Sequence, residues 1–291
     1  MTGLTAFDRA LAAVPGTASV WYGRPGAPPA YAHDPDVPHY AASLMKLAVL
    51  AAVHREHDGD RLDLDEPVPV RNDFPSAAPA GGRFGCRRRY DNDDAVWDRL
   101  TTTVPLRWLA HRMIVRSSNL ATNLVLDRVG IRTADEIWRA VGARHSTVGR
   151  LIEDASAAEA GITNLVTVAD LAALLAAIDT AGHGAGAGAG TRFVSRTAGD
   201  AMVDTLLAQA STEDLAAGLP PGTRAAHKNG WIMGVRHSAG IVWPTDAPPF
   251  LLAVCLTTPW AVNRHDDDAC QLVARLATLA WSHRHDLLER G

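Results

Sequence analysis

The sequence predicts an α/β (α+β) protein with one five-stranded antiparallel sheet, flanked by N- and C-terminal helices and interrupted by an all-helical lobe. Three observations lead to this prediction: strand-like runs lie near both ends of the chain, helical periodicity fills the middle, and an amphipathic segment lies at each terminus. A single sheet built from both ends is the most economical way to pack these elements. We therefore expect one unit with an α/β lobe from residues 1–40 and 215–291 and a helical lobe from residues 41–214.

The first half of the chain contains short apolar runs before it becomes helical. The turn "RPGAPP" separates two strand-like runs, Leu44, Leu47 and Leu50 recur at helical spacing, and Gly130 closes a helical run as a C-cap. The expected elements are a helix at about 5–14, strands at 17–23 and 29–34, a helix at 43–57, a Gly/Pro/Arg-rich loop at 71–94, and helices at 105–116 and 118–130.

The second half returns from helices to strands. The expected elements are helices at 133–141 and 167–180 around an irregular stretch at 143–166, a low-complexity connector at 181–191, strands at 222–230, 236–244 and 249–258, and a helix at about 265–288. The three strands are spaced like an antiparallel meander with short turns.

The bulk composition disfavours several classes of function. The 291 residues are 47% hydrophobic with a formal net charge of -4, which is typical of a soluble globular protein and disfavours nucleic acid or an anionic membrane as partner. Asp8 and Arg9 lie where a signal peptide needs an apolar core. We therefore expect a cytoplasmic protein, monomeric or weakly dimeric, although a secreted or periplasmic chain trimmed of its signal would look the same.

Cysteine and histidine spacing does not indicate a metal site or a disulfide framework. The three cysteines, Cys86, Cys255 and Cys270, are odd in number and widely spaced. His54 and His57 lie three apart on a predicted helix, and "RHDDDAC" (264–270) starts another, but neither has a third convergent ligand. No metal and no cofactor are expected.

Lysine is rare in this chain. Of the 28 basic side chains, 26 are arginine, and the two lysines are Lys46 and Lys228. Arginine stays protonated at any workable pH, whereas a desolvated lysine can act as a base. Each of the two lysines is therefore a candidate for a chemical role.

The first candidate element is Ser43-Leu44-Met45-Lys46, at the start of a predicted helix. Residues three apart share a helix face, so the lysine amine can approach the serine hydroxyl. The helix N-terminus also supplies unpaired N–H groups for a developing oxyanion. Alone, the motif fits equally an N-cap serine followed by a solvated lysine.

The second element is Ser117-Ser118-Asn119, between two predicted helices. Ser117 and Asn119 can point into one cleft, as a proton relay and as an amide that binds a substrate carbonyl. The alternative is an ordinary helix N-cap.

The third element is Lys228-Asn229-Gly230, inside a predicted strand. A lysine there is costly unless it faces a cleft, and Gly230 lets another backbone or a ligand approach closely. The alternative is a strand-edge lysine before a turn.

Together, these elements resemble the three signature motifs of the penicillin-recognising serine hydrolases, the class A β-lactamases and penicillin-binding proteins. Residues 103–130 resemble the segment through the second motif, including Asn123, residues 166–178 the helix after the omega loop, and residues 235–244 the strand after the third motif. The resemblance implies the β-lactamase/transpeptidase fold and a small-molecule substrate that bears a carboxylate.

The resemblance also implies roles for individual residues. Ser43 would attack an acyl carbonyl, and Lys46 would take its proton or help relay it. Ser117 would pass a proton to the leaving nitrogen, with Lys228 beside it as a positively charged group of low pKa.

The remaining implied roles concern substrate binding. Asn119 would bind the substrate amide, and the backbone N–H groups of Ser43 and Trp231 would form the oxyanion hole. Arg236, with Asn229, would hold a carboxylate.

Three features depart from the family pattern. Asn229 replaces the usual threonine of the third motif, and the omega loop lacks the Arg-x-Glu-x-x-Leu-Asn sequence. Among Glu153, Asp154 and Glu159 we favour Glu153 as the base that activates the deacylating water, the alternative being a solvated loop acid. The long loop at 71–94 should overhang the cleft, where "CRRRY" is either a site for an anionic substrate or a solvated segment.

We expect a class A β-lactamase-like serine hydrolase that forms an acyl-enzyme on Ser43 and hydrolyses a β-lactam. One alternative keeps the chemistry in a cytoplasmic esterase, amidase or peptidase with a non-antibiotic substrate. Another alternative is a catalytically silent protein that only binds a ligand.

Overall fold

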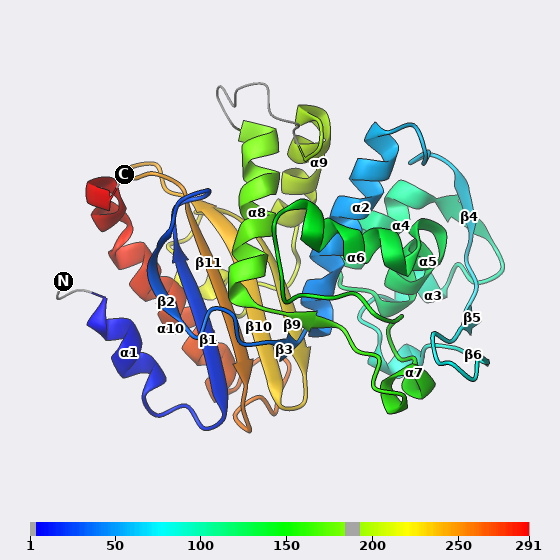
Figure 1. The fold of residues 1–291 in the computed structure, drawn as a ribbon, viewed down its shortest axis with the longest axis horizontal. Coiled ribbons are helices and arrows are strands. Elements are labelled where there is room, and N and C mark those ends of the chain that lie inside the picture. The colour runs from blue at the N-terminus through cyan, green and yellow to red at the C-terminus, as the bar shows by residue number, and fades with distance from the viewer. Residues whose placement is uncertain (1–3, 184–192, 291) are drawn as a thin grey trace.

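The computed structural model describes residues 4–183 and 193–290, so most of the connector expected at 181–191 lies outside the described residues. A twisted sheet with helices on both faces lies beside a group of helices formed by the middle of the chain (Figure 1). Both ends of the chain lie on the sheet side of the molecule.

The sheet has five strands in the order β2-β1-β11-β10-β9, and every neighbouring pair is antiparallel. The strands are β1 (Thr17–Gly23), β2 (Pro29–His33), β9 (Arg224–Ile232), β10 (Val235–Trp243) and β11 (Phe250–Thr257). The predicted fold class and the pairing of strands from both ends are therefore confirmed. β9 is an edge strand, and this edge faces the helical part of the molecule.

Successive side chains of a strand point to opposite faces of the sheet, so alternate residues belong to two different hydrophobic cores. On β1 and β11, Val20 and Val254 pack with the N- and C-terminal helices, whereas Ala253 and Cys255 pack with the helices of the middle segment. The covering helices are α1 (Thr5–Leu11) and α10 (Asp268–Ser282) on one face and α8 (Val168–His183) on the other. α10 is shorter than the helix expected to residue 288, because a 3-10 segment, η4 (Arg284–Arg290), follows it.

α2 (Lys46–Asp58) is the central helix of the second part. Residues 46–54 are all buried, since apolar side chains surround this helix on every side. Its neighbours are α4 (Leu106–Val115), α5 (Asn119–Val129), α6 (Ile131–Ala140) and α9 (Arg196–Leu207). α9 was not among the expected elements; its N-cap is Ser195, whose hydroxyl accepts a hydrogen bond from the Ala198 N–H.

Several short elements lie between the longer helices and strands. They are β3 (His39–Tyr40) paired with β8 (Leu165–Val166), β4 (Pro67–Pro69) with β7 (Thr103–Pro105), β5 (Phe74–Pro75) with β6 (Arg83–Phe84), the helices α3 (Asp94–Trp97) and α7 (Ala155–Glu159), and the 3-10 turns η1 (Ala42–Met45), η2 (Arg88–Tyr90) and η3 (Ala216–Gly218). Within the part of the chain that the structure describes, no helix is long and apolar enough to span a bilayer.

Candidate active site

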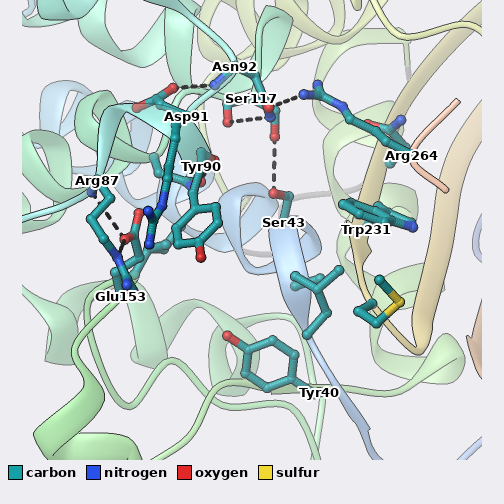
Figure 2. Close-up of a pocket in the computed structure, with 18 of the residues that line it drawn as sticks. Tyr40, Ser43, Arg87, Tyr90, Asp91, Asn92, Ser117, Glu153, Trp231 and Arg264 are labelled. Carbon is teal, nitrogen blue, oxygen red and sulfur yellow. Dashed lines mark hydrogen bonds and ion pairs between the residues drawn. The ribbon is translucent and has the colours of Figure 1, made fainter. Parts of the chain in front are cut away.

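A cavity of about 750 Å³ lies where edge strand β9 meets η1, the α4–α5 junction and the segment before α3. Eight of the residues expected in the site line it: Ser43, Ser117, Asn119, Glu153, Asn229, Gly230, Trp231 and Arg236. Figure 2 shows Ser43 below Ser117, with Trp231 and Arg264 on one side and Arg87, Tyr90 and Glu153 on the other. Both lysines lie buried behind this wall.

Ser43 lies in the 3-10 turn η1 immediately before α2, rather than in the first turn of the α-helix itself. Gly230 of β9 packs against this turn. A Cβ added to Gly230 would lie 3.0 Å from the Ser43 nitrogen and 3.3 Å from the Ala42 Cβ. The backbone approach therefore requires glycine, in agreement with the expectation for this position.

Lys46 is fully buried, which excludes the alternative of a solvated charge. Its Nζ donates to the Ser117 carbonyl oxygen at 2.8 Å, to Ser117 Oγ at 3.2 Å and to Asn119 Oδ1 at 3.1 Å. Ser117 Oγ in turn donates to Ser43 Oγ at 3.0 Å. Among the described residues, Lys46 is thus linked to Ser43 through the Ser117 hydroxyl.

Burial changes the acid–base chemistry of both lysines. Desolvation lowers the pKa of Lys46 to about 7, with Asp91 opposing the shift and Arg264 reinforcing it. The pKa of Lys228 is lowered well below its ordinary value, first by burial and then by repulsion from Lys46. A substantial fraction of Lys46 is therefore neutral near pH 7 and able to accept a proton.

The three residues of the second motif have separate tasks. The middle residue, Ser118, is the N-cap of α5 and accepts a hydrogen bond from the Ala121 N–H. Ser117 adopts a left-handed backbone (φ 57°), which presents both its carbonyl and its hydroxyl to Lys46. Ser118 therefore acts as a helix cap, and the side chains of Ser117 and Asn119 lie in the cavity wall.

The third motif lies on β9, where Lys228 pairs with Ala239 of β10. Lys228 Nζ donates to the carbonyl oxygen and to Oδ1 of Asn229, at 2.7 and 3.3 Å. Asn229, which stands where the family has threonine, therefore accepts both of these hydrogen bonds from the Lys228 amine. Trp231 follows at the cavity wall, and its indole N–H is buried with no partner among the described atoms.

Arg236 lines the cavity, but its guanidinium is buried and already occupied by other partners. Its side chain has no exposed surface, and its Nη2 donates to the Asn263 carbonyl oxygen at 2.6 Å. Asp214 and Asp267 lie 3.8 and 3.5 Å from the guanidinium nitrogens. Because two buried carboxylates already neutralise Arg236, the expected carboxylate-binding role has no support in this geometry.

Arg264 lies in the cavity wall instead. Its Nη1 donates to Asn92 Oδ1, and Asn92 Nδ2 lies 3.5 Å from the Ser117 carbonyl oxygen. Sequence reasoning missed this arginine because "RHDDDAC" resembles a charged helix start. The sequence cannot show whether Arg264 has a carboxylate partner, because its neighbours in space lie far from it along the chain.

Glu153 lines the cavity but has no contact with the nucleophile. Its backbone is left-handed (φ 65°), and its Oε2 accepts from the Arg87 backbone N–H at 3.1 Å. Its Oε1 is buried without a partner among the described atoms, and no hydrogen bond joins this carboxylate to Ser43 or Lys46 there. Of the neighbouring acids, Asp154 also lines the cavity but its carboxylate caps α7, whereas Glu159 is exposed outside the cavity wall.

The segment at 71–94 reaches the cavity, as expected, through Arg87, Arg89 and Tyr90. The guanidinium carbons of Arg87 and Arg89 lie 4.7 and 4.8 Å from the centre of the Tyr90 ring. Arg88 points elsewhere and pairs with Asp94 at 2.6 Å. The three consecutive arginines therefore divide between the cavity and the surface.

The chain matches the model of the Beta-lactamase enzyme family over residues 5–283. A β-lactamase of Streptomyces fradiae is 27% identical over 254 residues, which are 82% of this chain and 72% of that protein. The structure of PBP-A superposes with a TM-score of 0.75 at 20% identity, covering 100% of this chain and 97% of that one. A β-lactamase from Sphaerobacter thermophilus gives a TM-score of 0.76 at 22% identity, covering 98% of each chain. At these identities the two structures show a shared fold.

Proposed function

Because the chain belongs to the Beta-lactamase enzyme family, we propose that it is a serine hydrolase whose Ser43 is acylated by a cyclic or linear amide, with a β-lactam as the leading substrate class. The observation that carries the proposal is the continuous hydrogen-bond chain from Lys46 through Ser117 to Ser43 in the wall of one cavity. A nucleophile linked to a base of lowered pKa is the arrangement that acyl transfer needs.

In the proposed reaction, Ser43 Oγ attacks the acyl carbonyl carbon. The hydroxyl proton moves to Ser117 as Ser117 gives its own proton to neutral Lys46, and the carbon–oxygen bond forms. The backbone N–H groups of Ser43 and Trp231 hold the oxyanion. The carbon–nitrogen bond then breaks, and Lys46 returns the proton through Ser117 to the leaving nitrogen.

We assign the substrate carboxylate to the side of the cavity that holds Lys228, Asn229 and Arg264. Arg264 replaces Arg236 in this assignment, because its guanidinium lines the cavity and has no carboxylate bound to it among the described residues. A planar guanidinium can bind a carboxylate through two parallel N–H groups.

The acyl group should leave slowly when the substrate is a β-lactam. Deacylation needs a base that activates water, and Glu153 is held by Arg87 rather than by the relay that contains Ser43. The second candidate function, an esterase, amidase or peptidase of the same fold with a non-antibiotic substrate, needs the same activation of water and differs from the first only in its substrate. The intact relay disfavours a protein that only binds a ligand, since such a protein has no chemical need for a buried lysine.

Intact-mass spectrometry after mixing with penicillin G tests the proposal, with Ser43→Ala as the control. We expect an adduct of the full penicillin mass that persists over minutes in the parent protein and is absent from the variant. Rapid product without an adduct would indicate efficient β-lactam hydrolysis. Equal adduct or product from Ser43→Ala would refute the nucleophile assignment, and turnover of simple esters without reaction with penicillin would favour the second candidate.

A further inference from the structure

The active-site cavity continues into a second cavity of about 700 Å³ on the far side of Asn92. Four residues line both cavities: Arg89, Asp91, Asn92 and Arg264. These shared walls show that the two spaces adjoin. The second cavity, which we call the arginine groove, is lined by Arg88, Arg89, residues 91–95, Arg112, Arg116 and Arg264.

Part of the positive charge in this groove is already neutralised. Arg112 donates two hydrogen bonds to the carboxylate of Asp93, and Arg88 pairs with Asp94 and, at 2.8 Å, with Asp98. The Arg112–Asp93 pair carries no net charge, and Arg88 with Asp94 and Asp98 carries a net charge of -1, so these ion pairs leave no positive charge for a ligand.

Three arginines in the groove have no such partner. For Arg89, Arg116 and Arg264, no ion pair with a carboxylate is formed within residues 4–183 and 193–290. Asp91, the remaining acid of the groove, already accepts hydrogen bonds from the Ser118 hydroxyl and the Leu120 N–H. The groove therefore keeps an excess of positive charge next to the site of acyl transfer.

Two of these guanidinium groups are held in place before any ligand arrives. Arg89 stacks on the Tyr90 ring with its guanidinium carbon 4.8 Å from the ring centre, which leaves its N–H edges free. Arg264 is fixed by its hydrogen bond to Asn92. Pre-ordered side chains lose less conformational entropy on binding, which favours a ligand site over a solvated surface.

The groove lies on the leaving-group side of the proposed reaction. Asn92 contacts Arg264 through Oδ1 and approaches the Ser117 carbonyl oxygen through Nδ2, at 3.5 Å. Ser117 is the residue that returns the proton to the leaving nitrogen. A group bound in the groove would therefore belong to the part of the substrate attached to the leaving nitrogen, whether that part stays tethered, as in a β-lactam, or departs, as in a linear amide.

We propose that the arginine groove is a second anion subsite, so that the part of the substrate attached to the leaving nitrogen carries two anionic groups. The first lies beside Lys228 and Arg264, and the second, a carboxylate or a phosphate, lies between Arg89 and Arg116. This inference rests on the proposed function for its chemistry, but the binding of the anion does not require acylation.

The test is calorimetric titration of the Ser43→Ala protein with anions that it cannot turn over. The ligands are acetate, the dicarboxylates succinate, glutarate and adipate, and 3-phosphonopropionate, which carries one phosphonate in place of a carboxylate. We expect at least one two-headed anion to bind about tenfold more tightly than acetate, since a charged hydrogen-bonded pair is worth about that factor. Tighter binding of the phosphonate than of the dicarboxylates would assign the second group as a phosphate.

The variant Arg89→Ser/Arg116→Ser, built on Ser43→Ala, locates the binding. It should lose about tenfold in affinity for the two-headed anions. The matched control is Arg132→Ser/Arg139→Ser, which removes the same charge from two exposed arginines of α6 and should leave every affinity unchanged.

Two results would overturn the inference: two-headed anions that bind no more tightly than acetate, or equal affinities in the groove variant and its parent. Because Ser43→Ala forms no acyl-enzyme, these results are independent of the penicillin experiment. A failure of acylation and a failure of the anion subsite can therefore be told apart.

Discussion

The relay makes the acylation of Ser43 depend on pH through Lys46. Burial lowers the pKa of Lys46 to about 7, and only the neutral amine can accept the proton that Ser43 releases. The acylation rate should therefore rise with pH up to about pH 7 and level off above it. An ordinary solvated lysine would produce the same rise more than three pH units higher.

The size of the effect follows from the fraction of neutral amine. With a pKa of about 7, about one half of Lys46 is neutral at pH 7, about a tenth at pH 6 and about a hundredth at pH 5. The rate should fall about fivefold between pH 7 and pH 6 and about tenfold between pH 6 and pH 5. The Arg264 charge contributes to the lowered pKa, so the variant Arg264→Ser should shift the midpoint of the profile to higher pH.

The assay is the single-turnover acylation rate with p-nitrophenyl acetate, measured by quenching and intact mass between pH 5 and 10. This neutral ester needs no carboxylate anchor, so Arg264→Ser can be compared directly with the parent protein. A flat profile from pH 5 to 8 would show that Lys46 is not the base, and a midpoint above pH 9 would show that burial does not lower its pKa. A midpoint that Arg264→Ser moves downward would contradict the electrostatic reasoning.

Three further predictions test neighbouring parts of the structure. Gly230→Ala should slow acylation about tenfold, because the new Cβ would lie 3.0 Å from the Ser43 nitrogen and displace the nucleophile; an unchanged rate constant would contradict this packing. Ser117→Ala should slow acylation by about 10² or more, since the link between Lys46 and Ser43 is lost; a loss below threefold would refute the relay. Burial lowers the pKa of His54 from 6.5 to about 4. Between these pH values the unfolded chain binds more protons than the folded protein, so the stability that the neutral buried ring contributes is present above pH 6.5 and is lost as the pH falls. The free energy of unfolding, measured with urea, should fall between pH 8 and pH 5.5 in both proteins, and this fall should be about 1.4 kcal/mol smaller in His54→Gln than in the parent. Equal falls would show that His54 is not buried in its neutral form.

Much of the architecture could be predicted because local patterns determine it. The run "FLLAVCLTT" and the leucines after Ser43 are buried whatever their neighbours are, and they became β11 and α2. Helix α9 was missed although Ser195 is a favoured cap, because its apolar face is narrow and a low-complexity segment precedes it. The pairing of β3 with β8 was missed because each strand has two residues, too few for a period to appear.

The sequence by itself determined which chemistry-bearing residues to consider: two lysines, the serine turn and the glycine of the edge strand, with their order along the chain. The tertiary structure alone decided how they connect. Lys46 reaches Ser43 through Ser117, which lies 71 residues beyond Lys46 in the chain. Both Arg236 and Arg264 line the cavity, but Asp214 and Asp267 already flank the buried Arg236 guanidinium, so Arg264 is the arginine assigned to the substrate carboxylate. Periodicity reports whether a residue is buried, whereas the direction and charge partner of its side chain depend on packing between segments far apart in the sequence.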